Sequence, residues 1–190
     1  QPCGGVRVGT PSAPLGARPT AGLGGVGIGG LGHMALRFRS KWGCEVTAFT
    51  SSDAKRDEAM SMGAHHVVNS RDSAALEPLA GSLDFIVSTV NASLDWDAYI
   101  GALSPKGRLH VVGAVLEPIP VGAFSLIMSQ RSISGSPVGS PATIATMFDF
   151  AARHGIAPST ETFPMSKVND AFEHLRSGKA RYRIVLEAGA

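Results

Sequence analysis

Six consecutive residues, Gly27-Ile28-Gly29-Gly30-Leu31-Gly32, limit most strongly what this 190-residue chain can fold into. Their spacing is G-x-G-x-x-G, which carries little weight without suitable surroundings. Here an apolar run near 23–27 precedes the motif, and a helical pattern of apolar residues follows it. This order of strand, glycine turn and helix predicts a helix N-terminus that presents free amide groups to the phosphates of a dinucleotide.

Each of three glycines has its own expected task in such a turn. Gly27 would permit the tight bend, and Gly29 would let the backbone approach a diphosphate without a Cβ in the way. Gly32 would let the helix pack closely on the strand. The alternative is a glycine-rich hairpin or loop, but the strand before the motif and the helix after it favour the phosphate-binding turn.

The rest of the chain alternates short apolar segments with segments of helical periodicity. This alternation is typical of βαβ units and of a parallel sheet covered by helices on both faces. It predicts the α/β class, with a doubly wound, parallel, six-stranded Rossmann sheet. The expected strands lie near 23–27, 45–50, 66–69, 83–90, 108–113 and 132–136.

The expected helices follow from apolar spacing and from glycine stops. After the glycine turn, Leu31, Ala35, Phe38 and Trp42 recur at helical spacing, and Gly43 ends the pattern. The other expected helices lie at 53–63, 94–103, 141–153 and 166–176, and the tail adds strands near 160–163 and at 181–187.

The composition argues against several classes of protein. Hydrophobic residues make up 44% and charged residues 17%, which is typical of a globular protein with a core. A net charge of +2 without a basic run supports neither nucleic acid nor an anionic membrane as partner. No apolar stretch has the length of a membrane span, and residues 1–20 show no secretory signal. Because Cys3 and Cys44 make no disulfide framework, we expect a cytoplasmic protein.

The end of the second expected strand bears on which dinucleotide binds. An NAD site usually has an acid there, which binds the ribose 2′-hydroxyl, but this chain has Thr50. Small hydroxyl groups can donate to a 2′-phosphate, and Lys55 or Arg56 can neutralise it. The sequence therefore predicts a preference for NADP(H), which the charge of Asp53 would oppose. An ordinary helix N-terminus with solvated cations is the alternative, and the two are compatible.

The motif and its flanks, Val26 to Ala35, resemble the cofactor fingerprint of medium-chain zinc-dependent alcohol dehydrogenases. The similarity is to the branch of cinnamyl alcohol dehydrogenases and bacterial NADP-dependent aldehyde reductases. Residues 62–70, 133–136 and 178–183 resemble the same branch, and the likeness extends from about Val26 to Leu186. It implies hydride transfer between a nicotinamide and an alcohol or aldehyde, with zinc polarising the substrate oxygen.

The resemblance also implies where the cofactor is held. The 2′-phosphate contacts fall at the end of the second strand, and the ribose and nicotinamide contacts follow the fourth, fifth and sixth strands. The implied cofactor-binding residues are Gly27, Gly29, Gly30, Leu31, Gly32, Thr50, Ser51, Ser52, Lys55, Thr89, Val90, Asn91, Val112, Gly113, Ala114, Ser136 and Gly139. Open parallel sheets bind ligands at these strand ends.

Only one zinc ligand of the family has a match in this sequence. Cys3, in Cys3-Gly4-Gly5-Val6, corresponds to the ligand just before the cofactor domain, and the other ligands have no counterpart. A catalytic zinc needs about three protein ligands, so Cys3 is equally well interpreted as a spare thiol. We assign no catalytic residue and expect the chain alone to be catalytically incomplete.

The resemblance divides the chain into three parts. Residues 1–20 would lead in from a catalytic domain, 21–141 would form the NADP-binding domain, and 142–190 would return to the catalytic domain. Because the usual partners of a strand at 181–186 are largely missing, we expect the tail to be mobile or to dock in some other way. The family commonly dimerises near residues 125–137, so a homodimer is expected.

Two alternative functions stay open at this point. One is a non-catalytic NADP-binding module or fragment, and the other is a zinc-free quinone oxidoreductase-like reductase, for which Cys3 would be irrelevant. A methyltransferase is less favoured because Thr50 is not the acid that typically holds a ribose. Two histidines are of interest: His33 could contact a phosphate or be solvated, whereas His110 is expected to be packed or hydrogen-bonded within a strand.

Overall fold

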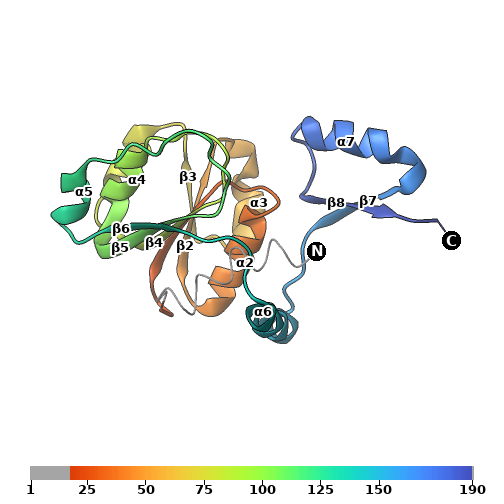
Figure 1. Ribbon diagram of the computed structural model, residues 1–190, viewed down its shortest axis with the longest axis horizontal. Coiled ribbons are helices and arrows are strands. Elements are labelled where there is room, and N and C mark those ends of the chain that lie inside the picture. Colours follow the sequence, from red (N-terminus) through yellow and green to blue (C-terminus); the bar gives the residue numbers. More distant parts are fainter. Residues whose placement is uncertain (1–17, 190) are drawn as a thin grey trace.

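The computed structural model describes residues 18–189, and its main body is a parallel sheet between two layers of helices (Figure 1). The six strands are β1 (Gly22–Val26), β2 (Glu45–Thr50), β3 (His66–Asn69), β4 (Leu83–Ser88), β5 (Leu103–Val111) and β6 (Ser132–Gly135). They pair in the order β3-β2-β1-β4-β5-β6, and every neighbouring pair is parallel. The strand order reverses direction between β1 and β4, so their carboxyl ends form the switch point at which such sheets bind ligands.

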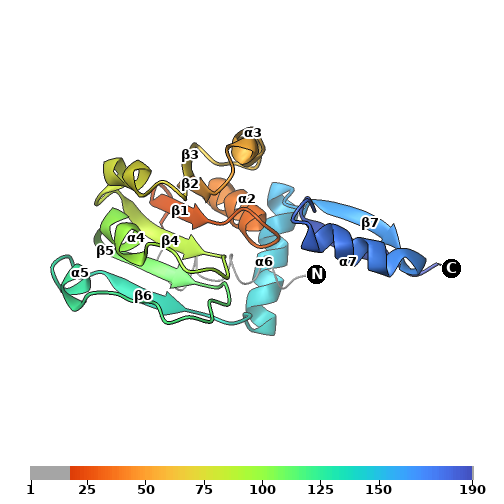
Figure 2. The ribbon, with the colours of Figure 1, turned by 90° about the horizontal axis from the view of Figure 1, so that it is seen from above.

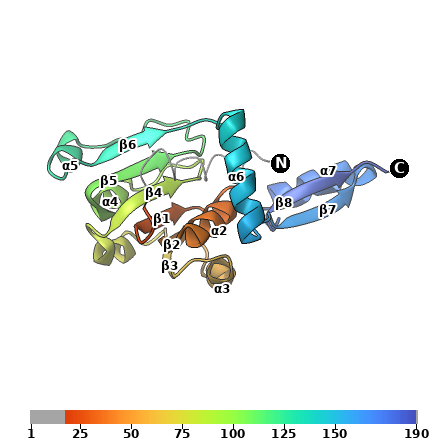
Figure 3. The same ribbon diagram turned by 90° about the horizontal axis from the view of Figure 1, so that it is seen from below.

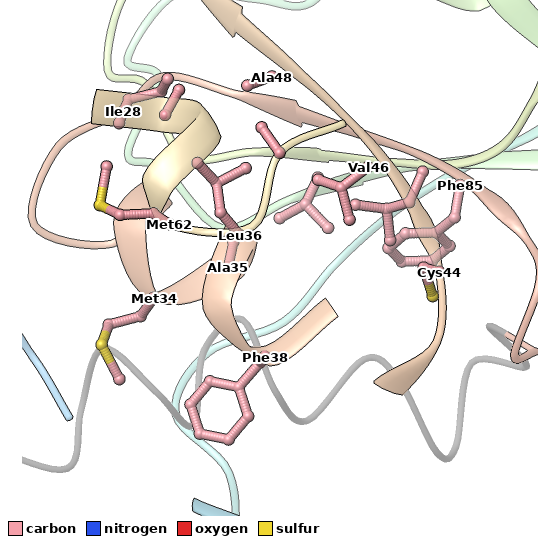
Figure 4. Close-up of a cluster of buried hydrophobic side chains, with 14 of the residues drawn as sticks. Ile28, Met34, Ala35, Leu36, Phe38, Cys44, Val46, Ala48, Met62 and Phe85 are labelled. Carbon is pink, nitrogen blue, oxygen red and sulfur yellow. The ribbon is translucent and has the colours of Figure 1, made fainter. Parts of the chain in front are cut away.

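Three helices cover one face of the sheet: α2 (Gly32–Trp42), α3 (Arg56–Ser61) and α6 (Pro141–His154). Their apolar residues form one cluster with the inward side chains of the strands. Figure 4 shows part of this cluster, in which Leu36 of α2 and Val46 of β2 are both buried. Full burial of one such side chain contributes about 1.5–3 kcal/mol, so this face fixes α2 firmly behind the glycine turn.

The opposite face is covered by the 3-10 segment η2 (Ser73–Leu79), α4 (Trp96–Ala102) and α5 (Ala123–Ile127). Trp96 and Tyr99 of α4 are each 2% exposed. The ring of Tyr99 meets Phe49 of β2 edge-on, with centroids 5.2 Å apart. Aromatic pairs prefer this geometry, which gives the second layer a rigid contact with the sheet.

The C-terminal part contains β7 (Thr160–Pro164), η3 (Met165–Lys167), α7 (Val168–Arg176) and β8 (Arg183–Glu187). β7 and β8 pair in parallel as a separate two-stranded sheet. Figures 2 and 3 show α6 between the main sheet and this unit. Phe150 of α6 lies 5.9 Å from Phe38 and 5.4 Å from Trp42, both on α2. Therefore α6 packs with the core of the main body, although the sequence predicts it as part of the return segment.

The α/β class, the six parallel strands and their doubly wound order are confirmed. The fifth strand begins at Leu103 instead of 108 because its register with β4 shifts between Leu83 and Phe85. The expected helix at 53–63 starts as a 3-10 turn, η1 (Asp53–Lys55), and continues as α3. η2 and α5 were not predicted, since η2 contains Pro78 and α5 is only one turn long.

The C-terminal tail was expected either to be mobile or to dock in some other way, and in the structure it docks. β8 pairs with β7, and Tyr182, just before β8, is 5% exposed. Arg37 of α2 donates to the hydroxyl of Ser159 at 3.1 Å. These contacts hold the C-terminal unit against the helix that follows the glycine turn. Between residues 18 and 189 we find no helix with the length and apolar character that crossing a membrane requires.

Candidate dinucleotide site

The glycine turn joins β1 to α2 with a different constraint at each glycine. Gly27 has a φ of 86°, in the left-handed region that side chains disfavour. A Cβ on Gly32 would lie 1.7 Å from the carbonyl oxygen of Gly27. A Cβ on Gly29 would meet nothing within 4 Å. The turn therefore needs glycine for its shape at two positions, and at the third it leaves open space where a diphosphate is predicted.

The loop after β4 is locked onto this turn. The Thr89 hydroxyl lies 2.9 Å from the carbonyl oxygen of Val26 and 3.0 Å from that of Gly27, to which it donates. A Cβ on Gly113, just after β5, would lie 1.8 Å from the carbonyl oxygen of Val90. The ends of β1, β4 and β5 are thus in direct contact. The Thr89 hydroxyl is engaged by backbone carbonyl oxygens of the turn.

An open cleft of about 670 Å³ lies at this switch point. Its volume is within the ordinary range for small-molecule sites. The lining residues are Gly27, Ile28, Gly29, Gly30, Leu31, Thr89, Val90, Asn91, Ala92 and Arg183. Seven of the predicted cofactor residues line this cleft: Gly27, Gly29, Gly30, Leu31, Thr89, Val90 and Asn91. Gly32 is not in the lining and packs against the carbonyl group of Gly27.

The other predicted contacts lie outside this cleft, at the ends of neighbouring strands. They are Thr50 as the last residue of β2, with Ser51, Ser52 and Lys55 after it, Val112, Gly113 and Ala114 after β5, and Ser136 and Gly139 after β6. All of these lie at or after the carboxyl ends of strands in the same parallel sheet, so they share one edge with the cleft.

The end of β2 carries the predicted 2′-phosphate contacts. Thr50 is 4% exposed, and its hydroxyl accepts from the backbone N–H of Ser52 at 3.3 Å. Ser51 is exposed, and Ser52 forms no side-chain cap on the following 3-10 turn. Lys55 reaches back and donates from Nζ to the carbonyl oxygen of Ile28 at 3.1 Å. Burial, and secondarily Arg181, lowers the pKa of Lys55.

Three basic side chains form hydrogen bonds with consecutive carbonyl oxygens of the glycine turn, at residues 28–30. Lys55 Nζ donates to the first at 3.1 Å, and His33 Nδ1 lies 3.0 Å from the second. Arg183 Nε donates to the third at 2.9 Å. The turn is therefore held from three directions by α2, by η1 and by the C-terminal segment.

His33 is a connector between the turn and the C-terminal unit. Its side chain is fully buried, and the backbone N–H of Ser159 donates to Nε2 at 3.3 Å. Because Nε2 accepts, the ring hydrogen is assigned to Nδ1, which then donates to Gly29. Burial lowers the pKa of His33, which agrees with a neutral ring. The structure thus turns His33 toward the backbone, and the idea that it contacts a phosphate gains no support.

His110 lies in β5 and holds the end of β6. Its ring nitrogens lie 2.8 Å from the Ser134 hydroxyl and 2.9 Å from the Ser136 hydroxyl. Burial lowers the pKa of His110 to about 4, so the ring is neutral at pH 7. The prediction of a hydrogen-bonded histidine is confirmed, and the hydroxyl of Ser136 is placed by this contact.

The described residues do not provide a zinc site. Within 18–189, no three His, Cys, Asp or Glu side chains gather in a way that could hold a metal ion. Cys3 lies outside the described residues. Cys44 is buried, and burial raises the pKa of its thiol, so it behaves as a small core residue.

Arg183 lines the cleft, a role that the sequence analysis does not predict. The stretch 178–183 supports the family resemblance, yet nothing in its local pattern indicates a contact with the glycine turn. The side chain reaches Gly30 only because β8 docks beside α2. No short sequence motif therefore predicts the contact between Arg183 and Gly30.

A parallel sheet in this order, with a glycine turn at its switch point, defines a Rossmann-type dinucleotide-binding domain. A sequence profile described as zinc-binding dehydrogenase matches residues 30–153, which is more than half of the chain. The chain belongs to this family.

Relatives with known names support the same assignment. The chain is 54% identical over 184 residues to an aldehyde reductase, AdhA, of Synechocystis sp., covering 97% of this chain and 55% of the relative. A cinnamyl alcohol dehydrogenase from Sorghum bicolor matches with a TM-score of 0.92 and 39% identity, over 97% of this chain and 53% of that one. A protein named CAD from Helicobacter pylori, solved in complex with NADP(H), matches with a TM-score of 0.84 and 30% identity, over 97% of this chain and 52% of that one. The chain spans about half the length of the curated relatives it matches.

Proposed function

We propose that this chain is the NADP(H)-binding part of a zinc-dependent alcohol dehydrogenase or aldehyde reductase. The observation that carries the proposal is the glycine turn at the switch point, with Lys55 held against its Ile28 carbonyl. The NADP(H) complex of the Helicobacter pylori relative supports it. When bound, the nicotinamide accepts or delivers the hydride that interconverts an alcohol and an aldehyde.

The residues of the cleft would hold the diphosphate. The backbone at Gly29 offers open space, and the first amide groups of α2 carry the partial positive charge of a helix N-terminus. Arg183 adds a full cation to the lining. The amide groups and Arg183 favour an anion at the turn, and Gly29 leaves its approach free of a side chain.

The adenosine end would lie at the end of β2. The hydroxyls of Ser51 and Ser52 can donate to a 2′-phosphate, and Lys55 supplies a cation that can approach it. The nicotinamide end would lie over the loops after β4, β5 and β6, where Val90, Gly113 and Ser136 are fixed by the contacts described above. The dinucleotide would thus cross the sheet edge from β2 to β6.

Lys55→Ala is expected to weaken NADPH binding by about 1–3 kcal/mol and to leave NADH binding almost unchanged, since only NADPH carries the 2′-phosphate. Parallel calorimetric titrations with both dinucleotides measure this difference. Lys41→Ala is the matched control, because Lys41 is exposed in the last turn of α2, away from the glycine turn. Equal losses for the two dinucleotides, or no binding of either to the folded wild-type chain, would contradict the proposal.

We also propose a homodimer formed along the β6 edge of the sheet. α5, which directly precedes this edge strand in the chain, and the residue after it expose large apolar side chains, among them Phe124 and Met128, which are 76% and 77% exposed. Light scattering is expected to give twice the 19.6 kDa of one chain, and Phe124→Asp with Met128→Asp is expected to give the monomer. A monomeric wild type would refute this assembly.

The cytoplasmic location of the protein stays a prediction.

A further inference from the structure

We infer that Tyr182 is the positioning residue of the 2′-phosphate site: its ring holds the ammonium group of Lys55 and thereby sets the preference for NADPH over NADH. The inference rests on the proposed function and extends it to a residue of the C-terminal segment, outside the sheet. It assigns a binding role to a tyrosine that makes no contact of its own with the predicted dinucleotide.

Tyr182 lies at the centre of the contact between the C-terminal segment and the glycine turn. Its side chain is 5% exposed, and its ring stacks on His33 with centroids 4.8 Å apart and an interplanar angle of 14°. Lys55 Nζ lies 5.8 Å from the centre of the same ring. The face of an aromatic ring is negative and attracts a cation at this distance, most strongly where water is excluded.

Two contacts fix an ammonium group that would otherwise be free to move. A lysine side chain is flexible, with a point charge at its end. Here the Ile28 carbonyl takes one N–H donor of Lys55, and the Tyr182 ring attracts its charge. An ammonium group has three donors, so at least one stays available for a phosphate oxygen. The ring thus orders the lysine beside the turn without using up its hydrogen bonds.

The neighbouring charges are arranged so that Lys55 can stay there. Arg181 lies 5.7 Å from the Tyr182 ring, and its cation would repel Lys55. Its Nε donates to Glu58 of α3 at 3.0 Å, and its backbone N–H donates to Glu161. Arg183 is engaged by the Gly30 carbonyl. The acidic partners offset Arg181, and the ion pair with Glu58 ties α3, directly after Lys55, to the C-terminal segment.

The test compares variants of Tyr182 in the full chain by calorimetry with NADPH and with NADH. Tyr182→Leu keeps apolar bulk and removes the ring, so the Kd for NADPH is expected to rise about tenfold, and that for NADH by less than about twofold. Tyr182→Phe keeps the ring face and is expected to restore the wild-type ratio. If Tyr182→Leu does not fold, Tyr182→Met serves as a second ring-free variant.

Two further variants separate positioning from stability. Tyr99→Leu removes the only other tyrosine, which is buried on the opposite face of the sheet, and should lower the melting temperature without moving the NADPH-to-NADH ratio. In a Lys55→Ala background, Tyr182→Leu should have no further effect on that ratio, because the residues act as one unit. A wild-type preference that survives Tyr182→Leu overturns this inference alone. A folded wild type with no preference for NADPH overturns both this inference and the proposed function.

Discussion

Gly32→Ala is expected to destabilise the chain by about 3 kcal/mol or more and to abolish dinucleotide binding. The added methyl carbon would lie 1.7 Å from the Gly27 carbonyl oxygen. The methyl carbon is attached rigidly to Cα and the oxygen belongs to the backbone, so neither can rotate away as the end of a long side chain could. The start of α2 must therefore move off β1. Urea unfolding measures the loss of stability, and calorimetry with NADPH measures the loss of binding.

Gly29→Ala is the matched control for this prediction, because the same methyl group meets nothing within 4 Å at that position. Its stability should be equal to that of the wild type or slightly higher, since alanine restricts the unfolded chain. Its affinity for dinucleotides should still fall, because the methyl group would occupy the approach of the diphosphate. A Gly29→Ala variant with full affinity would mean that the diphosphate does not lie against this turn.

Thr50→Asp is expected to reverse the dinucleotide preference. The carboxylate would stand where NAD sites usually place an acid, and it would repel the 2′-phosphate by about 3 kcal/mol, or roughly 100-fold in Kd. NADH is expected to gain about tenfold from a charged hydrogen bond with its ribose hydroxyl. The new side chain can accept from the Ser52 N–H as the threonine hydroxyl does, so the β2 end should keep its shape. Parallel calorimetric titrations measure the reversal.

Thr50→Asn separates charge from shape in the same experiment. Asparagine has the size of aspartate without its charge, so NADPH should bind far better to Thr50→Asn than to Thr50→Asp. If the two variants lose NADPH affinity equally, the 2′-phosphate does not lie beside residue 50. Rising salt should narrow the gap between them, because ions screen charge repulsion and leave shape unchanged.

Much of the fold could be predicted because the signals are local. The apolar run and glycine spacing around residues 23–32 describe a strand, a turn and a helix within one short segment. The expected strands at 45–50 and 66–69 coincide with β2 and β3. The fifth strand was misplaced at its start because its irregular register depends on pairing with β4, which the sequence of β5 alone does not encode.

The candidate site divides in the same way. The residues of the turn and of the β4 loop could be placed at the cleft because parallel strands bring their carboxyl ends to one edge. The contribution of Arg183 could not be predicted, since its contact with Gly30 depends on how a distant strand docks. The role of His33 was equally hidden, because its tautomer follows from a backbone N–H at Ser159.

The sequence by itself determined the parallel sheet, the glycine turn between β1 and α2, and the threonine in place of an acid at position 50. These features depend on periodicity and on the conformational freedom of glycine, which act over a few residues. Only the tertiary structure decided that the Tyr182 ring contacts both the His33 ring and the Lys55 ammonium group, and that basic side chains from three elements hold the turn. The physical reason is that these contacts join segments far apart in the chain, so they depend on how the segments pack and not on any local pattern.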